Sequence, residues 1–226
     1  FTGPSCSVDT ACSSSLVCMH FVSTLIQTEQ SDSSMALGTS MDLVAQTSVI
    51  FKVSGMLAPD GRCKCLDQAG DGYVRAESMG ALVMKRMCDE DDSILLLVSG
   101  TCINQDGRSS SLTAPNGPSQ QAVIRSALEA AAIRVDQVEE LEMHGTGTSL
   151  GDLIEIGAAC AVLIGAKTKR GAFTLAAAKT AFGHAETGAG MIGALRAISS
   201  VTHGAVKPVT NLRAVNPYVA ATFKIA

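Results

Sequence analysis

The spacing of apolar residues along this chain predicts an alternation of helices and strands. Helices are indicated by apolar residues at intervals of three and four, or by a run of small apolar residues, over residues 12–28, 118–133, 151–164 and 187–201. Short apolar runs bounded by turn residues predict strands over residues 35–44 (a buried strand followed by a turn), 141–144 and 174–178. Strands that alternate with helices indicate an α/β fold in which helices cover a sheet.

Three other segments refine this prediction. The apolar runs 81–86 and 94–100 flank the acidic segment 89–92, which predicts a hairpin with a solvated turn. Residues 55–78 are rich in Gly, Asp and Arg, so we expect irregular structure there. The helix over 187–201 is apolar on most sides, and we therefore expect it to be buried.

Composition narrows the class of protein. The 226 residues are 46% hydrophobic and 17% charged, which is typical of a soluble globular protein with a large core. The net charge is −4 and no basic block alternates with aromatic residues, so we expect no nucleic-acid partner. No apolar run is long enough to span a bilayer, and no signal peptide opens the sequence. The first residue is Phe rather than Met, from which we infer that the chain is a fragment.

The eight cysteines stand singly and form no CxxC pair, so no metal site is predicted. Most of them fit small buried hydrophobic residues, and free thiols in this number favour a reducing compartment. We therefore expect a cytoplasmic protein, or a plastid protein if a transit peptide precedes the chain.

Cys12 is the exception among these thiols. It sits in Ser7–Leu16, which consists of a strand-like lead-in, a run of small residues and then the apolar-periodic start of the helix over 12–28. This layout predicts a thiol in the first turn of a helix, where unpaired N–H groups and the helix dipole stabilise a thiolate. The small neighbours leave room for a carbonyl to approach, which favours a covalent thioester intermediate.

Two of the four histidines, His144 and His184, stand in glycine-rich loops, whereas His20 and His203 do not. A single histidine of this kind is more often structural than catalytic. Two of them together with an activated cysteine favour chemistry. Each of the three residues follows a strand-like run and precedes a helix, which predicts that they meet where an α/β sheet holds its site.

The motifs around these residues resemble the β-ketoacyl synthase (ketosynthase) domain of type I polyketide synthases. The resemblance lies in Asp9–Leu16, in His144–Thr148, and in Lys179–Thr180 followed by Gly183–His184. It extends, in the order of that family, to four further blocks: Pro59–Cys63, Asp71–Arg75, Asn104–Arg108 and Leu112–Gln121.

The resemblance implies the thiolase fold, with αβαβα layers built from two related halves. Residues 1–100 would then be the end of the N-terminal half, and residues 101–226 a C-terminal half, with the domain incomplete at both ends. It also implies a homodimer. We expect the isolated fragment to fold poorly or to lack activity, because walls of the site and an oxyanion-hole donor would lie outside it.

The resemblance further implies a decarboxylative Claisen condensation. Cys12 would accept an acyl group from an acyl carrier protein, while His144 and His184 would hold a malonyl-type extender thioester. Two neutral imidazoles can donate hydrogen bonds to the enolate that forms when the extender loses CO₂. No cofactor would bind directly, since the phosphopantetheine arm belongs to the carrier protein.

The roles of the neighbouring residues are left open between two interpretations each. Lys179 matches the family's site lysine and is either an electrostatic organiser, with Glu186 as its partner, or part of a structural ion pair. Thr146 and Thr148 either hydrogen-bond the pantetheine arm or only support their loop. Asp152 either caps the helix that follows or braces the site through a hydrogen bond.

Two other functions remain possible from the sequence. One is a fatty-acid-type ketosynthase with the same chemistry. The other is a thiolase-fold scaffold or chain-length partner without catalysis, which the presence of Cys12 and both histidines disfavours.

Several positions depart from the family's pattern. Ala76 and Ser78 stand where the family often has Gly, and a positive φ at either would add strain. Ser110–Ser111, Leu153 and Ala181–Phe182 also replace common family residues. We expect these changes to affect substrate preference more than catalysis.

Overall fold

The computed structural model describes residues 3–87, 94–109, 114–164 and 173–225. Helices and strands alternate along it as follows: α1 Ser14–Gln27, β1 Ser33–Ser40, α2 Ala45–Val53, β2 Ser78–Lys85, α3 Gly117–Ala130, β3 Glu140–Glu142, α4 Gly151–Leu163, β4 Thr174–Ala176, α5 Lys179–Phe182, α6 Ala189–His203 and α7 Pro217–Ile225. Short 3₁₀ turns, η1 (Val135–Gln137) and η2 (Glu186–Gly188), precede β3 and α6.

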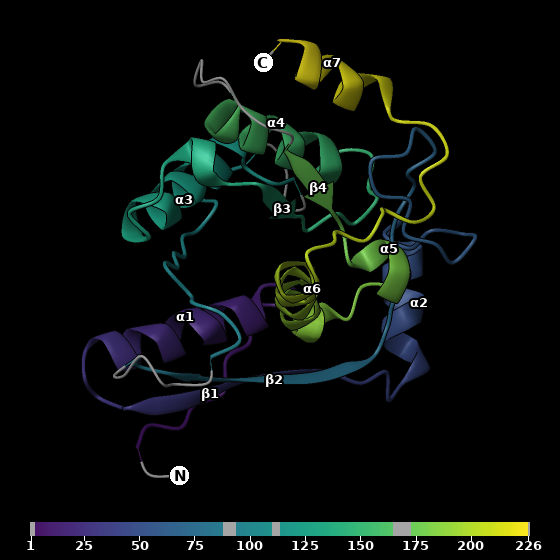
Figure 1. The fold of residues 1–226 in the computed structure, drawn as a ribbon. Helices are drawn as coiled ribbons and strands as arrows, with labels where there is room; N and C mark the ends of the chain where they lie inside the picture. Colours follow the sequence, from purple (N-terminus) through teal and green to yellow (C-terminus); the bar gives the residue numbers. More distant parts are fainter. Residues whose placement is uncertain (1–2, 88–93, 110–113, 165–172, 226) are drawn as a thin grey trace.

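The elements stack in layers that Figure 1 shows from bottom to top. The antiparallel pair β1–β2 forms the lowest layer, with Ser33 opposite Lys85 and Ser40 opposite Ser78. Helices α1 and α6 lie on this pair, and the parallel pair β3–β4 lies above α6. Helices α3, α4 and α7 cover the other side of β3–β4. The described residues therefore form a βαβα stack within the predicted α/β fold.

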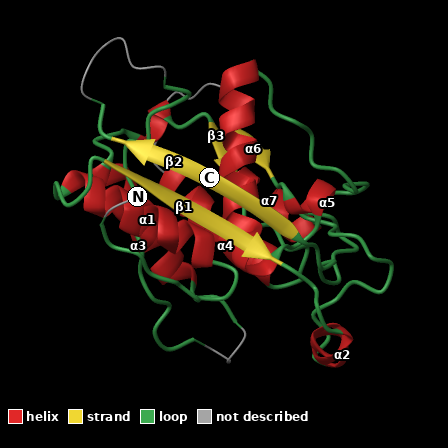
Figure 2. Cartoon of the chain, turned by 90° about the horizontal axis from the view of Figure 1, so that it is seen from below, coloured by secondary structure: helices red, strands yellow, loops and turns green. Residues whose placement is uncertain are grey.

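The two strands of the lowest layer alternate between a face that packs on α1 and α6 and a face that is open. Figure 2 views the pair from its open face, where no helix lies in front of it. The open face carries apolar side chains, the larger of which are Met35, Leu37, Met79 and Val83. The strand predicted over residues 35–44 is thus confirmed over 33–40, but it is buried on one face only.

The lower helices approach the sheet closely because the facing strand positions are small. A β-carbon at Gly38 would come within 2.9 Å of the β-carbons of Met191 in α6 and Ser15 in α1. This side of the stack holds one core cluster, Met19, Val22, Ile26, Ala36 and Met191. The clean periodicity of α1 therefore corresponds to a real packing face.

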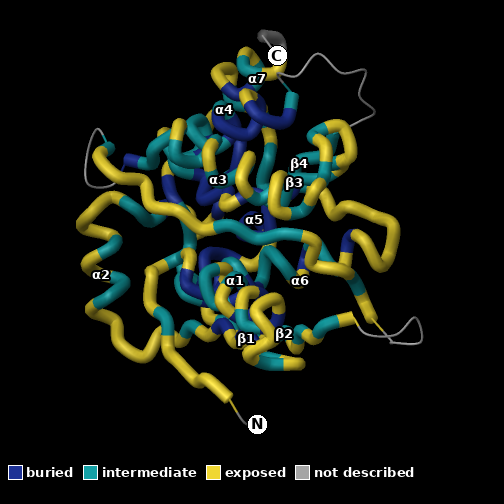
Figure 3. The backbone as a smooth tube through the Cα atoms, turned by 90° about the vertical axis from the view of Figure 1, so that its left-hand side faces the viewer, coloured by how far each residue is buried: buried dark blue, intermediate teal, exposed yellow. Residues whose placement is uncertain are grey.

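A second core lies between β3–β4 and the upper helices, and Figure 3 shows the buried segments concentrated in the middle of the molecule. Helix α3 starts where predicted, because Asn116 caps it by accepting a hydrogen bond from the Ser119 N–H at 3.1 Å. Its periodic face packs on α4. No residue of α3 or of α2 is fully buried.

The predicted hairpin between residues 81–86 and 94–100 is wrong. Strand β2 pairs with β1 over its whole length, and residues 94–100 form no strand. Apolar alternation shows that a segment can join a sheet, but the choice of partner depends on packing against α1 and α6, which local sequence does not encode. The predicted turn at 89–92 lies outside the described residues.

Two smaller expectations also need adjustment. Helix α6 is buried on one side only: Met191 is buried, whereas Val201 is exposed. Ala76 and Ser78 both have negative φ, so the strain considered for them is absent. Ser110–Ser111 lie outside the described residues.

In the described part of the chain, no helix is long and apolar enough to cross a bilayer.

Candidate active site

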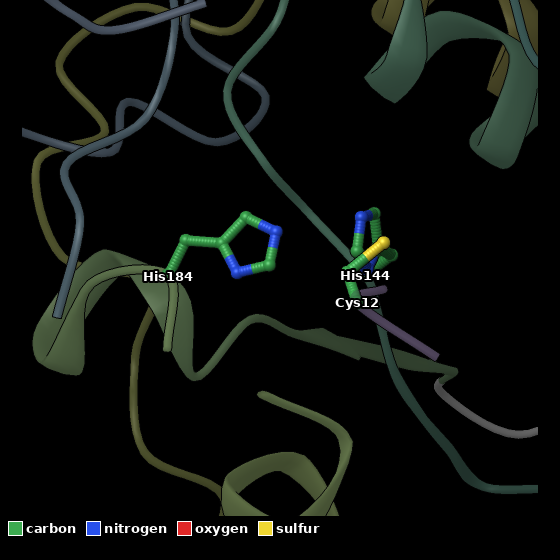
Figure 4. A group of neighbouring side chains, drawn as sticks. All are labelled: Cys12, His144 and His184. Atoms are coloured by element: carbon green, nitrogen blue, oxygen red, sulfur yellow. The ribbon is translucent and has the colours of Figure 1, made fainter. Parts of the chain in front are cut away.

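Cys12, His144 and His184 converge on one point of the structure. The Cys12 sulfur and one ring nitrogen of each histidine lie within 4.8 Å of one another. In Figure 4 the His184 ring points toward Cys12 and His144. The three residues come from separate segments, directly before α1, after β3 and after α5. The predicted meeting of three distant motifs is therefore observed.

The chain turns sharply at Cys12. Helix α1 begins at Ser14, so Cys12 precedes the helix and is not in its first turn, and no strand leads into it in residues 3–9. Ala11 has a φ of 55°, and its N–H donates to Asp9 Oδ1 at 3.0 Å. The Thr10 N–H donates to Ser14 Oγ at 2.8 Å. This strained, hydrogen-bonded turn places the thiol just before the N-terminus of α1. The periodicity of the helix does not indicate such a turn.

His184 has a defined tautomer. Its Nδ1 accepts a hydrogen bond from the Glu186 backbone N–H at 3.1 Å, so the proton of the neutral ring is on Nε2. The ring is almost fully buried and meets the edge of Tyr73, with centroids 4.8 Å apart. Its backbone pairs with a neighbouring segment: the His184 N–H donates to Val74 O at 2.7 Å, and the Ala76 N–H donates to His184 O at 3.1 Å. His184 is thus an oriented Nε2–H donor.

The His144 loop is held by its main chain. The backbone N–H groups of His144 and Gly145 donate to the two carboxylate oxygens of Glu155 in α4. Gly145 has a φ of 51°, and a β-carbon there would lie 2.8 Å from the Cys65 sulfur. His144 is an exposed residue, and its ring stands edge-on to the His184 ring, with centroids 5.5 Å apart at 89°.

Both imidazoles are neutral near pH 7. Burial within the protein lowers the pKa of His184 to about 3, and the positive charge of Lys179 acts in the same direction. Desolvation of the ring by the surrounding protein lowers the pKa of His144 to about 3 as well, although part of the residue is exposed, and Lys179 and His184 act in the same direction. The two rings are therefore hydrogen-bond donors rather than cations.

Lys179 opens α5 and is nearly fully buried. Burial lowers its pKa, while the charge of Glu155 and then that of Cys12 act to raise it. The predicted pairing with Glu186 is not observed: Glu186 pairs with Arg75, whose Nε lies 2.7 Å from Glu186 Oε1. In the η2 turn, the Glu186 N–H points at His184 and the Glu186 carboxylate points toward Arg75. Arg75 is distant in the sequence, so spacing did not indicate it as the partner.

Asp152 braces the glycine-rich loop rather than capping α4. Its Oδ1 accepts from the Gly147 N–H at 3.0 Å and its Oδ2 from the Leu66 N–H at 2.8 Å, and burial raises its pKa. Glu155, the acceptor for the His144 N–H, is not among the residues that the motifs predicted for the site. Its signal was present, because it lies three residues after Asp152 and hence on the same face of α4.

Thr146 and Thr148 hydrogen-bond each other through their hydroxyls at 3.1 Å. The Gly151 N–H donates to Thr148 Oγ1 at 3.2 Å. These contacts fit support of the loop, and they leave lone pairs for a ligand.

The geometry alone admits two kinds of ligand. A cysteine beside two neutral imidazoles can form and process a thioester, and the same sulfur and nitrogen atoms could ligate a metal such as Zn²⁺. The family to which the chain belongs decides between them.

Two family models match the chain. The β-ketoacyl synthase N-terminal domain matches residues 1–90, and the β-ketoacyl synthase C-terminal domain matches residues 95–213. The chain therefore belongs to the β-ketoacyl synthase family, a family of acyltransferase-type enzymes.

Curated relatives are components of polyketide synthases. One component of the phenolphthiocerol/phthiocerol polyketide synthase of Mycobacterium tuberculosis is 38% identical over 225 residues, which cover 97% of this chain and 12% of the relative. Another component of the same synthase is 40% identical over 222 residues, covering 97% of this chain and 14% of the relative. The chain thus spans about an eighth of the length of these relatives.

Solved ketosynthase structures share the fold. The oxazolomycin ketosynthase domain of Streptomyces albus superposes with a TM-score of 0.92 at 32% identity, over 97% of this chain and 38% of that one. The ketosynthase from module 6 of the bacillaene synthase of Bacillus subtilis gives 0.89 at 34% identity, over 93% and 38%. The expected thiolase-like fold is confirmed, and the βαβα stack is the portion of it that the described residues form.

Proposed function

We propose that this chain carries the condensing site of a polyketide synthase. The site would join an acyl group held on Cys12 to a malonyl-type extender on a carrier protein. The observation that carries the proposal is the convergence of Cys12, His144 and His184 within 4.8 Å in a member of the β-ketoacyl synthase family.

The first step is transfer of the acyl group. The Cys12 thiolate attacks the carbonyl carbon of the carrier-bound thioester, and a tetrahedral oxyanion forms. Collapse of that intermediate breaks the bond to the carrier sulfur, so the carrier leaves as a thiolate and an S-acyl Cys12 remains.

The second step is condensation. The extender loses its carboxylate as CO₂, and the electrons of the broken carbon–carbon bond pass into an enolate at the thioester. The Nε2–H of His184, together with an N–H of His144, stabilises that oxygen because both rings are neutral donors. The enolate carbon then attacks the acyl carbon, expels the Cys12 thiolate and leaves a β-ketoacyl thioester on the carrier.

The same proposal covers the partners. The phosphopantetheine arm of an acyl carrier protein would deliver both thioesters, and Thr146 and Thr148 would hydrogen-bond it with their free lone pairs. Lys179 would act as an electrostatic organiser, and Asp152 as a brace of the loop. Assembly as a homodimer and the division of the domain near residue 100 remain predictions from the family. The bacterial relatives favour a cytoplasmic location over a plastid.

The curated relatives also favour polyketide over fatty-acid synthesis, since those named above are polyketide synthases. A scaffold without catalysis is disfavoured, because the thiol and both imidazoles are present and close together.

Substitution of the nucleophile in the intact protein tests the proposal. Cys12→Ala should abolish formation of the acyl-enzyme, measured by mass spectrometry of the peptide that carries position 12, because the substitution removes the proposed nucleophile. Cys12→Gln should block loading but still release CO₂ from malonyl carrier protein, because the amide resembles an acylated cysteine. Unchanged acyl loading in Cys12→Ala would show that the nucleophile is assigned wrongly.

Thiol labelling gives an independent check. Cerulenin or iodoacetamide should modify Cys12 selectively, whereas uniform labelling of all eight cysteines would favour the scaffold.

A further inference from the structure

Arg75 lies beside the His184 loop but takes no part in the reaction described above. Its side chain is only 8% exposed. Its Nε donates to Glu186 Oε1 at 2.7 Å, one terminal nitrogen donates to Ser48 Oγ at 2.6 Å, and the other pairs with Asp42. The guanidinium carbon also lies 5.4 Å from the centre of the Phe51 ring. A buried guanidinium with this many partners has a single orientation.

The Arg75 backbone runs directly alongside His184. The residues on either side of it, Val74 and Ala76, exchange main-chain hydrogen bonds with His184, as in a short parallel bridge. The Arg75 side chain therefore reaches Glu186, two residues beyond the histidine, and both ends of the His184 loop are tied to the same segment.

Glu186 needs such an anchor because its backbone is strained. Its φ is 38°, a left-handed conformation that residues with a β-carbon rarely adopt. This conformation directs the Glu186 N–H at His184 Nδ1. The ion pair with Arg75 holds the carboxylate of the same residue, so it stabilises the conformation that fixes the His184 tautomer.

We propose that Arg75 is a positioning residue for the condensation: it holds Glu186 in the backbone conformation that keeps His184 an Nε2–H donor. Ser48 and Phe51 of α2, together with Asp42 just before that helix, also make Arg75 a link between the His184 loop and α2. Helix α2 has no buried residue and stands apart in Figure 2, so we expect the contacts of Arg75 with Ser48 and Phe51 to help hold it against the protein. The inference rests on the proposed function, since it assigns His184 a role in decarboxylation.

The test separates the two half-reactions in the intact protein. Arg75→Met removes the charge and the donors but keeps a long apolar side chain. We expect it to lower kcat for CO₂ release roughly 10²-fold in a Cys12→Gln background, because a misdirected donor no longer meets the enolate oxygen. The KM for malonyl carrier protein should change little. The rate of acyl loading, measured with Cys12 intact, should stay within about twofold of that of the unchanged protein, because loading does not depend on the donor that is misdirected.

Two further variants distinguish positioning from general stability. Arg75→Lys keeps the charge opposite Glu186 and should recover most of the lost CO₂ release. Arg196→Met breaks a comparably buried ion pair, with Glu142, and controls for lost stability. It should lower the melting temperature without changing the ratio of CO₂ release to acyl loading.

The outcomes separate this inference from the proposed function. If the Cys12→Gln protein releases no CO₂, the proposed function fails. If it releases CO₂ and Arg75→Met leaves kcat unchanged, Arg75 is only a structural ion-pair partner. An equal loss in loading and CO₂ release, matched by Arg196→Met, would also overturn the inference.

Discussion

The two histidine loops hold their imidazoles in different ways. In the His144 loop the main chain is clamped: the Glu155 carboxylate accepts two backbone N–H groups, and Asp152 accepts a third from Gly147. In the His184 loop the ring itself is held, since Nδ1 accepts from the Glu186 N–H and Tyr73 packs against the ring. One loop is fixed by carboxylates of the helix that follows it, and the other by a strained turn and a distant arginine.

This difference indicates a division of labour. A clamped backbone fixes the position of the residue, but the ring can still rotate and change its tautomer when a ligand binds. A hydrogen bond to Nδ1 also fixes which nitrogen carries the proton. We therefore expect His184 to be the pre-oriented donor of the pair and His144 the adaptable one.

The largest expected effect is loss of the His184 donor. His184→Ala should lower CO₂ release in the Cys12→Gln background by about 10²- to 10³-fold, as for removal of one oxyanion donor. His184→Gln places an N–H near the former Nε2, whereas His184→Asn places it near Nδ1. Gln should therefore retain clearly more activity than Asn. Equal activity of Gln and Asn would contradict the tautomer assignment.

The clamp of the other loop should matter next. Glu155→Ala leaves the N–H groups of His144 and Gly145 without their acceptor, and we expect it to lower the free energy of unfolding by roughly 2 kcal/mol. Urea denaturation measures this change. Glu155→Gln keeps one acceptor oxygen and should lose less. Equal stability of all three proteins would show that the clamp contributes nothing.

A pH series isolates the burial of His184. Its pKa is lowered from 6.5 to about 3 on folding, so between these values the unfolded chain binds a proton that the folded protein does not. The free energy of unfolding therefore does not depend on the titration of His184 well above pH 6.5. Below that value it falls as the pH decreases, by roughly 1.4 kcal/mol per pH unit. Unfolding of the unchanged protein between about pH 6.5 and 5.5 should show this extra slope relative to His184→Gln. Parallel curves would place His184 in a solvated site.

The smallest effect is expected behind the His184 loop. The Ser78 hydroxyl is buried without a hydrogen-bond partner among the described residues, and it lies close to Gly188 at the end of η2. Ser78→Ala should leave CO₂ release unchanged and raise the free energy of unfolding by about 1 kcal/mol or less. Ser33→Ala, at an exposed position of the paired strand, is the control. A marked loss of stability would show that the hydroxyl has a partner after all.

The sequence predicted correctly those features that depend on residues close together in the chain. The periodicity of α1, the Asn116 cap of α3 and the glycine-rich loops around His144 and His184 all depend on residues close in sequence. The motifs also indicated that Cys12, His144 and His184 belong together. The strand partner of β2 and the pairing of Glu186 with Arg75 were missed, because each joins elements far apart in the chain. The acceptor role of Glu155 was also missed, although Glu155 lies only 11 residues from His144 and on the same face of α4 as Asp152.

The sequence by itself determined the family, the three residues that meet at the candidate site and most of the helices. These follow from residue type and short-range spacing, which the chain keeps whether or not it is folded. Only the tertiary structure decided which partner each charged group has and which nitrogen of His184 carries its proton. Such choices depend on burial and on contacts across the layers, which come into existence only when α1, α4, α6 and the two strand pairs pack together.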